Sequence, residues 1–167
     1  MILKRILNRS VPQARPLYGA IVAAARHPSH YADLGVADTV DGRFEMVCLY
    51  LYLVLARLKG ENREEFRGEL TDEFFADMDR ALREMGVGDL SVGKKVRRMA
   101  ESFYGRVSAY EAAGEDEAAL APALARNVYA ESDARHAPAL AARARSVARK
   151  LASLPVEEVL AGKVDLT

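Results

Sequence analysis

The chain has 167 residues, of which 50% are apolar and 29% are charged, a balance typical of a soluble globular protein. Its 24 Lys and Arg residues equal its 24 Asp and Glu residues, so no overall field favours nucleic acid, and nucleic-acid read-out is not expected. The longest apolar run, Met46–Ala56, is about half the length that a membrane-spanning helix needs. Length and composition thus predict one domain, residues 1–167, with a sizeable core.

The first ten residues, MILKRILNRS, place apolar side chains on one face of a turn or two beside Lys4, Arg5 and Arg9. This short basic amphipathic segment either packs on the domain as a helix or docks weakly on a membrane surface. Pro16 is then expected to open a first long helix that ends before Pro28. The stretch that follows, 27–42, contains turn-forming residues and predicts a loop with one short helical turn.

A helix is predicted from Asp41 or Gly42 to Leu58, where Lys59-Gly60 stops it. Its side chains are apolar almost all round, which places it at the centre of a helical bundle. The only cysteine, Cys48, lies in this run, so we expect a buried, inert side chain and a reducing compartment.

The next two segments predict a long antiparallel helix hairpin. Asn62, with Glu65 three positions later, is a plausible cap for its first helix. Apolar residues then recur at helical spacing on either side of the Gly86-Val87-Gly88 break, and two amphipathic helices joined by so short a turn pack against each other. The first stripe is Phe66, Leu70, Phe74, Met78, Leu82 and Met85, and the second is Val92, Val96, Met99, Phe103, Val107 and Tyr110.

From Ala109 to Ala152 alanine supplies 17 of 44 residues. Apolar positions between Leu140 and Leu154 still predict a helix, and Pro155 is expected to start a last short helix that ends at Gly162. Residues 115–167 are therefore predicted to be alanine-rich helices that pack on the rest and bury little area per residue. The fold class expected is all-α, a single-domain bundle of about six to eight helices.

The string Gly88–Lys94 fits G-x-x-x-x-G-K, the first seven positions of a phosphate-binding loop. The eighth position, which should be Ser or Thr, is Lys95, and a helix rather than a strand precedes the string. Nucleotide binding is therefore disfavoured.

The sequence gives no pattern for catalysis, metal binding or a cofactor. No nucleophile motif is present, and no histidine accompanies the carboxylates of the hairpin. An enzyme stays the third alternative, for which a polar pocket lined by His27, His30 and Asp33 would be needed.

Two blocks, Leu17–Val47 and Phe75–Arg106, resemble the ubiquinol–cytochrome c chaperone family, the assembly factors for cytochrome b of the bc1 complex. The second block is specific, because Met-Asp-Arg, the turn Glu-Met-Gly-Val-Gly-Asp and Lys-Lys-Val-Arg-Arg-Met occur in that order. The resemblance covers about two-thirds of the chain and weakens after Tyr110.

The resemblance implies an all-helical, non-enzymatic chaperone without a cofactor that binds newly made cytochrome b before haem loading and assembly. Mitochondrial members also work with a small partner protein and with the ribosome. No Arg/Ser-rich transit peptide is seen, so a bacterial member is expected, cytoplasmic and peripheral at the inner face of the cytoplasmic membrane. The alternative is a non-catalytic interaction scaffold for another membrane or ribosomal partner.

Under this resemblance, the charged flanks of the hairpin become the candidate client site. An acidic strip beside a basic one could fix the charged loops of a membrane protein in one orientation. Seven tyrosines are present, and one or two exposed ones in a groove would suit an interface. The candidate partner-binding residues are Asp77, Asp79, Arg83, Glu84, Asp89, Lys94, Lys95, Arg98, Tyr104 and Arg106.

Overall fold

The computed structural model describes residues 13–130 and 133–167, and every regular element in these ranges is a helix. The predicted all-α bundle is thereby confirmed, while the amphipathic segment 1–10 lies outside the described residues. No helix in the described ranges is long and apolar enough to cross a membrane. The elements are α2 (Arg15–Ala25), α3 (Ser29–Ala32), α4 (Val40–Arg57), α5 (Glu64–Glu84), α6 (Asp89–Ala113), α7 (Glu117–Leu124), η1 (Ala125–Tyr129), η2 (Ala134–His136), α8 (Ala137–Ser153) and α9 (Val156–Leu160).

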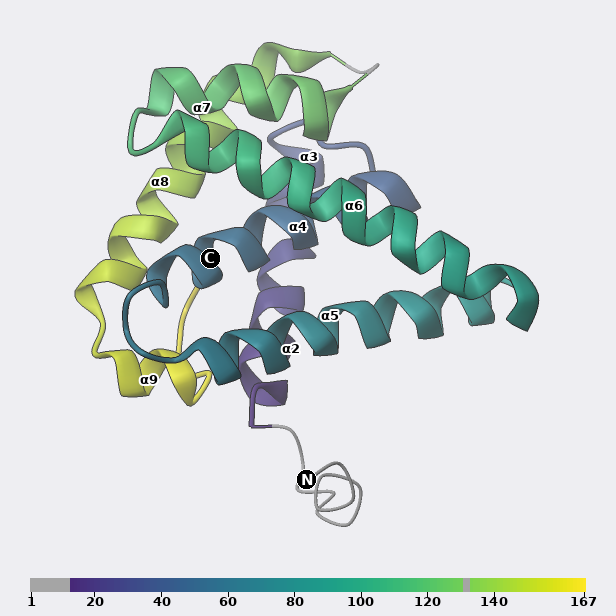
Figure 1. Cartoon of the computed structure of the whole chain (residues 1–167). Helices are drawn as coiled ribbons and strands as arrows, with labels where there is room; N and C mark the ends of the chain where they lie inside the picture. Colours follow the sequence, from purple (N-terminus) through teal and green to yellow (C-terminus); the bar gives the residue numbers. More distant parts are fainter. Residues whose placement is uncertain (1–12, 131–132) are drawn as a thin grey trace.

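Helix α4 is the centre of the bundle, as its apolar composition predicts. Every residue from Glu45 to Val54 is buried, and α4 contacts α2, α6, α8 and η1 (Figure 1). The hydroxyl of Thr39 caps its first turn by accepting a hydrogen bond from the Gly42 amide at 3.1 Å. A side chain at Gly42 has no room, because a Cβ there would lie 1.9 Å from the Ala37 carbonyl oxygen. Cys48 is buried in this helix, and burial raises the pKa of its thiol.

Helices α5 and α6 form the predicted hairpin and converge towards their turn, which projects from the remaining helices (Figure 1). The rings of Phe74 and Phe103, both fully buried, have centroids 5.2 Å apart in its seam. The predicted cap of α5 is wrong. Arg63 occupies the N-cap without a side-chain hydrogen bond, and Asn62 takes a left-handed conformation with φ of 56° in the preceding turn.

The alanine-rich region contains α7 and the π-helical η1, two elements that periodicity did not predict. Asp116 caps α7 by accepting a hydrogen bond from the Ala118 amide at 2.9 Å, and Pro122 lies inside the helix. The hydroxyl of Tyr129 in η1 donates to the Leu34 carbonyl at 2.7 Å, which ties η1 to the segment before α4. Helix α8 packs on both α4 and α7.

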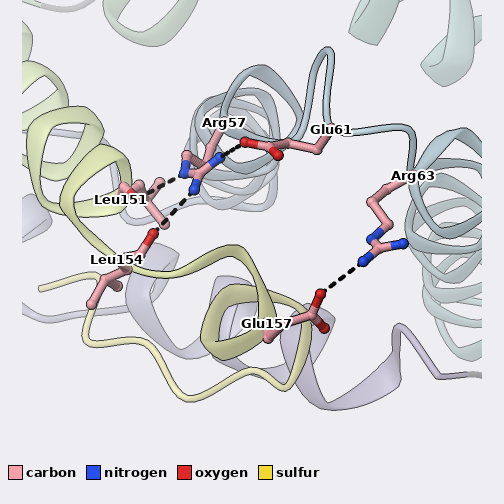
Figure 2. Close-up of polar contacts among 6 residues, drawn as sticks. All are labelled: Arg57, Glu61, Arg63, Leu151, Leu154 and Glu157. Carbon is pink, nitrogen blue, oxygen red and sulfur yellow. Dashed lines mark hydrogen bonds and ion pairs between the residues drawn. The ribbon is translucent and has the colours of Figure 1, made fainter.

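Arg57 at the end of α4 holds the end of α8 (Figure 2). Its Nε donates to the Leu151 carbonyl at 2.9 Å and its Nη2 donates to the Leu154 carbonyl at 3.0 Å, while Nη1 pairs with Glu61 at 2.5 Å. A cation placed on the last carbonyls of a helix satisfies acceptors that have no partner within the helix. Arg57 therefore joins the central helix to the C-terminal helices.

We predict that Arg57→Met lowers the free energy of unfolding by about 1–3 kcal/mol, because two half-buried carbonyls lose a charged donor. Urea unfolding followed by circular dichroism measures the change. Arg63→Met is the matched control, since it breaks the more exposed pair with Glu157 at 2.7 Å and should cost less than about 1 kcal/mol. Equal losses in the two variants would contradict the role given to Arg57.

Candidate functional site

A groove of about 810 Å³ runs between the start of α4, one flank of α6 and η1. Its α6 wall is formed by Arg98, Met99, Ser102 and Arg106, which recur at helical spacing and so share one side of the helix. The lining contains both apolar and charged side chains. The other lining residues are Ala37, Thr39, Val40, Asp41, Gly42, Phe44, Glu45, Arg126, Asn127, Val128, Tyr129 and Ala130.

The ion pair between Glu45 and Arg106 forms part of this lining. The guanidinium of Arg106 donates to both carboxylate oxygens, with Nε 2.5 Å from Oε2, and its Nη1 donates to the Ser102 carbonyl at 2.9 Å. Burial raises the pKa of the Glu45 carboxyl, because desolvation outweighs the stabilising guanidinium. Arg106 also lies over the Phe44 ring, 5.8 Å from its centroid. The pair thus fixes α6 against α4 and leaves Arg106 with its donors engaged.

The cations that stay available in the groove are Arg98 and Arg126. Both are exposed, and in the described residues neither takes part in an ion pair that would neutralise it. Val40 lies across the groove and is 62% exposed. Asp41, an exposed carboxylate, lies in the same lining. A groove that holds two accessible cations beside apolar side chains can bind a peptide segment that carries a carboxylate beside apolar side chains.

The opposite flank of α6 borders a second, smaller groove of about 370 Å³, shared with α4 and α5. Its most accessible ring is Tyr104, which is 54% exposed and lies 6.3 Å from the Phe75 ring between centroids. Tyr104 is the one exposed tyrosine among the described residues, and it lines this groove. Helix α6 therefore borders a groove of mixed charge, with Arg98 and Arg126 as its accessible cations, on one side and an aromatic groove on the other.

Several predicted site residues contact other parts of the chain. Asp77 accepts a hydrogen bond from the Tyr18 hydroxyl at 2.8 Å. Burial, and after it this hydrogen bond, raises the pKa of Tyr18. Arg83 pairs with Asp79 at 2.7 Å and with Asp89 across the turn. The Tyr18–Asp77 and Glu45–Arg106 contacts join the hairpin to α2 and α4, whereas the Arg83 pairs are exposed and lie within the hairpin.

The other predicted site residues are open to solvent. Glu84, Lys94, Lys95 and Arg98 are all exposed, and the described part of the chain supplies none of them with a hydrogen-bond or ion-pair partner. Lys94 and Arg98 are four residues apart on α6 and so lie on one face. The structure thus divides the predicted set into residues with intramolecular partners and residues without them, and Arg83 and Asp89 of the first group are exposed as well.

The residues from Gly88 to Lys94 begin α6 directly after another helix, with Gly88 as N-cap. This is not the strand, loop and helix order that a phosphate-binding loop requires.

The histidines do not form the polar pocket that an enzyme would need. His30 is buried, with Nε2 3.0 Å from the Ala24 carbonyl and 3.1 Å from the Tyr50 hydroxyl, whereas His27 is exposed and contacts Ser29. The groove beside His27 is lined by neither His30 nor Asp33. Burial lowers the pKa of His30, so its neutral ring serves packing.

The lowered pKa of His30 predicts how the free energy of unfolding depends on pH. The folded state holds His30 neutral, so below about pH 6.5 the unfolded state binds more protons and the free energy of unfolding falls. The slope contributed by one such group is at most about 1.4 kcal/mol per pH unit. Denaturation series between pH 7 and pH 5 should show a shallower slope for His30→Gln than for the wild type.

His27→Gln, which removes an exposed imidazole, serves as the matched variant in the same series. Parallel stability curves for the wild type and His30→Gln would contradict a neutral, buried His30.

Comparisons with known proteins agree with this architecture. A family model described as Ubiquinol-cytochrome C chaperone matches residues 32–166. The crystal structure of the Cbp3 homolog from Brucella abortus is similar over 99% of this chain and 98% of its own, with 40% sequence identity and a TM-score of 0.82. No curated protein sequence matches the chain.

The groove residues that sequence reasoning missed are those brought to α6 by other elements. Val40, Glu45 and Arg126 belong to α4 and η1 and reach the groove through packing. One signal was present: Glu45 is a lone carboxylate directly before the apolar run from Met46. A charge at such a position requires a partner when the helix is buried.

Proposed function

The chain belongs to the ubiquinol–cytochrome c chaperone family, and from this premise we propose that it binds newly synthesised cytochrome b and supports its maturation into the bc1 complex. Family membership implies a non-enzymatic role. We further propose that it works at the inner face of the cytoplasmic membrane, where such a client emerges.

The observation that carries the proposal is the groove along α6 together with the accessible cations beside it. A client made mainly of transmembrane helices leaves charged loops and short amphipathic pieces at the membrane surface. Arg98 and Arg126 can pair with carboxylates of such a loop, while Val40 and Met99 offer apolar contact. The buried pair of Glu45 and Arg106 holds the groove in shape before the client arrives.

We propose that the ten predicted residues act in two ways. The accessible ones, Glu84, Lys94, Lys95, Arg98 and Tyr104, contact the client. The others hold the hairpin in place through intramolecular contacts, and these are Asp77, Asp79, Arg83, Asp89 and Arg106.

Pulse labelling followed by capture of the tagged, full-length protein tests this function. Labelled cytochrome b should be most abundant in the eluate directly after the pulse and should decline during the chase, as assembly proceeds. A small partner protein or ribosomal proteins in the same eluate would extend the likeness to mitochondrial members. An eluate that lacks cytochrome b but contains another membrane or ribosomal protein would favour the scaffold alternative and contradict the proposal.

A further inference from the structure

The end of the α5–α6 hairpin, residues 83–98 and hereafter the hairpin tip, carries exposed apolar side chains. Leu90 is fully exposed, at 102% of its reference area, and Met85 is 55% exposed. Isolated exposed apolar residues are common on protein surfaces. These two, however, are five residues apart at the turn that projects from the other helices (Figure 1). The tip is therefore a convex element with apolar side chains at its end.

The hairpin tip is also cationic. It contains five Lys and Arg residues and two Asp and Glu residues, a net charge of +3. One of the two carboxylates, Asp89, is paired with Arg83. Arg97 pairs with Glu101 at 3.4 Å, whereas Lys94, Lys95 and Arg98 have no ion pair within the described ranges. The available charge at the tip is thus positive.

The apolar and cationic side chains lie together on α6. Leu90 and Lys94 are four residues apart, and Lys94 and Arg98 are four apart again, so the three follow one face from the turn inwards. Helices that bind at a membrane interface present this combination of apolar side chains and flanking lysines. The stem of a lysine lets its ammonium reach the phosphates while the neighbouring apolar groups insert.

We propose that the hairpin tip docks on the surface of a bilayer that contains anionic lipids, with Leu90 and Met85 among the head groups and Lys94 and Lys95 on the phosphates. A standard protein interface needs about 800 Å² on each side, which the end of the tip with its two apolar side chains does not offer, so a client that pairs with Lys94 and Arg98 needs most of its contact area in the neighbouring grooves. A bilayer requires no complementary shape, and its negative charge matches the tip. Lys94 and Lys95 are also among the residues proposed to contact the client, so the bilayer role is tested with vesicles alone, in an assay that contains no client.

Sedimentation of the full-length protein with phosphatidylcholine vesicles, with and without phosphatidylglycerol, tests the proposal. We expect binding to the anionic vesicles that weakens as salt is added and is much weaker on the neutral ones. Lys94→Gln combined with Lys95→Gln should weaken binding about 30-fold, from the contribution of each lysine near an anionic surface. Leu90→Ser should weaken it about tenfold. Since these side chains are exposed, circular dichroism should show unchanged helicity.

Two control variants sharpen the result. Arg149→Gln with Lys163→Gln removes two exposed cations away from the tip and should bind vesicles as the wild type does. Lys4→Glu with Arg5→Glu, in the full-length chain, tests the first ten residues as the competing anchor. The proposal is overturned if anionic vesicles are not preferred, or if the tip variants bind like the wild type while the Lys4 and Arg5 variant is released.

A last comparison separates the membrane from a protein partner. Leu90→Ser should still capture detergent-solubilised cytochrome b, because no bilayer is present in that assay. If the variant loses capture but keeps its binding to vesicles, the tip contacts the client and the membrane assignment is wrong.

Discussion

Reversing the charges of Lys94 and Arg98 together, as Lys94→Glu with Arg98→Glu, will abolish the capture of detergent-solubilised cytochrome b. Both side chains are exposed, they follow one face of α6, and within the part of the chain that the structure describes neither is neutralised. Coupling between close charges across an interface amounts to roughly 1.5–7 kcal/mol, so the double reversal should lower capture by about 100-fold or more. Capture on tagged protein, with cytochrome b quantified by immunoblot, measures the loss.

The matched control is Arg149→Glu with Lys163→Glu, which changes the net charge equally at exposed positions of the C-terminal region. It should capture cytochrome b as the wild type does, and both double variants should keep wild-type helicity. Unchanged capture by the Lys94 and Arg98 variant would refute the hairpin face as the client site. Equal loss in both variants would show an effect of net charge alone.

Replacing Arg106 by leucine will lower the free energy of unfolding by roughly 3–5 kcal/mol. The change leaves the Glu45 carboxylate, whose side chain is only 8% exposed, without its guanidinium in the wall of the groove. It also removes the donor to the Ser102 carbonyl. Because burial already raises the pKa of Glu45, protonation at low pH should reduce the penalty.

A double-mutant cycle in urea unfolding tests this pair. Glu45→Leu with Arg106→Leu should recover much of the loss, since an apolar pair of similar volume often replaces a buried ion pair without cost. If the double variant is as unstable as the sum of the two single variants, the pair is not coupled and its role in holding the groove is wrong.

The helices that the sequence predicted are those whose own apolar side chains determine which face is buried. The apolar run of α4 leaves it no position except the centre, and the stripes through Leu82 and Tyr110 give α5 and α6 one face each to bury. Met85, the last residue of the first predicted stripe, does not pack in the seam and is 55% exposed at the turn. The N-cap of a helix is less strictly determined by the local sequence than the buried face of the helix is. Asn62 was expected to cap α5, but the turn after Gly60 places it in a left-handed conformation instead.

The elements that the sequence missed depend on tertiary contacts. Helix α7 is too rich in alanine for a clear apolar stripe, and Pro122 within it argues locally against a helix. The site depends on such contacts even more, because Glu45 and Arg106 are 61 positions apart and meet only through the packing of α4 on α6. Periodicity therefore indicates which face of α6 is polar, whereas the groove beside that face can be identified only from the folded structure.

The abundance of cytochrome b in a strain that lacks this protein tests the central claim most directly. We predict that cytochrome b falls sharply while its messenger RNA is unchanged, and that the wild-type gene restores it whereas the gene with Lys94→Glu and Arg98→Glu does not. Normal levels of cytochrome b and of the assembled bc1 complex in the deletion strain would contradict a role for this chain in cytochrome b maturation.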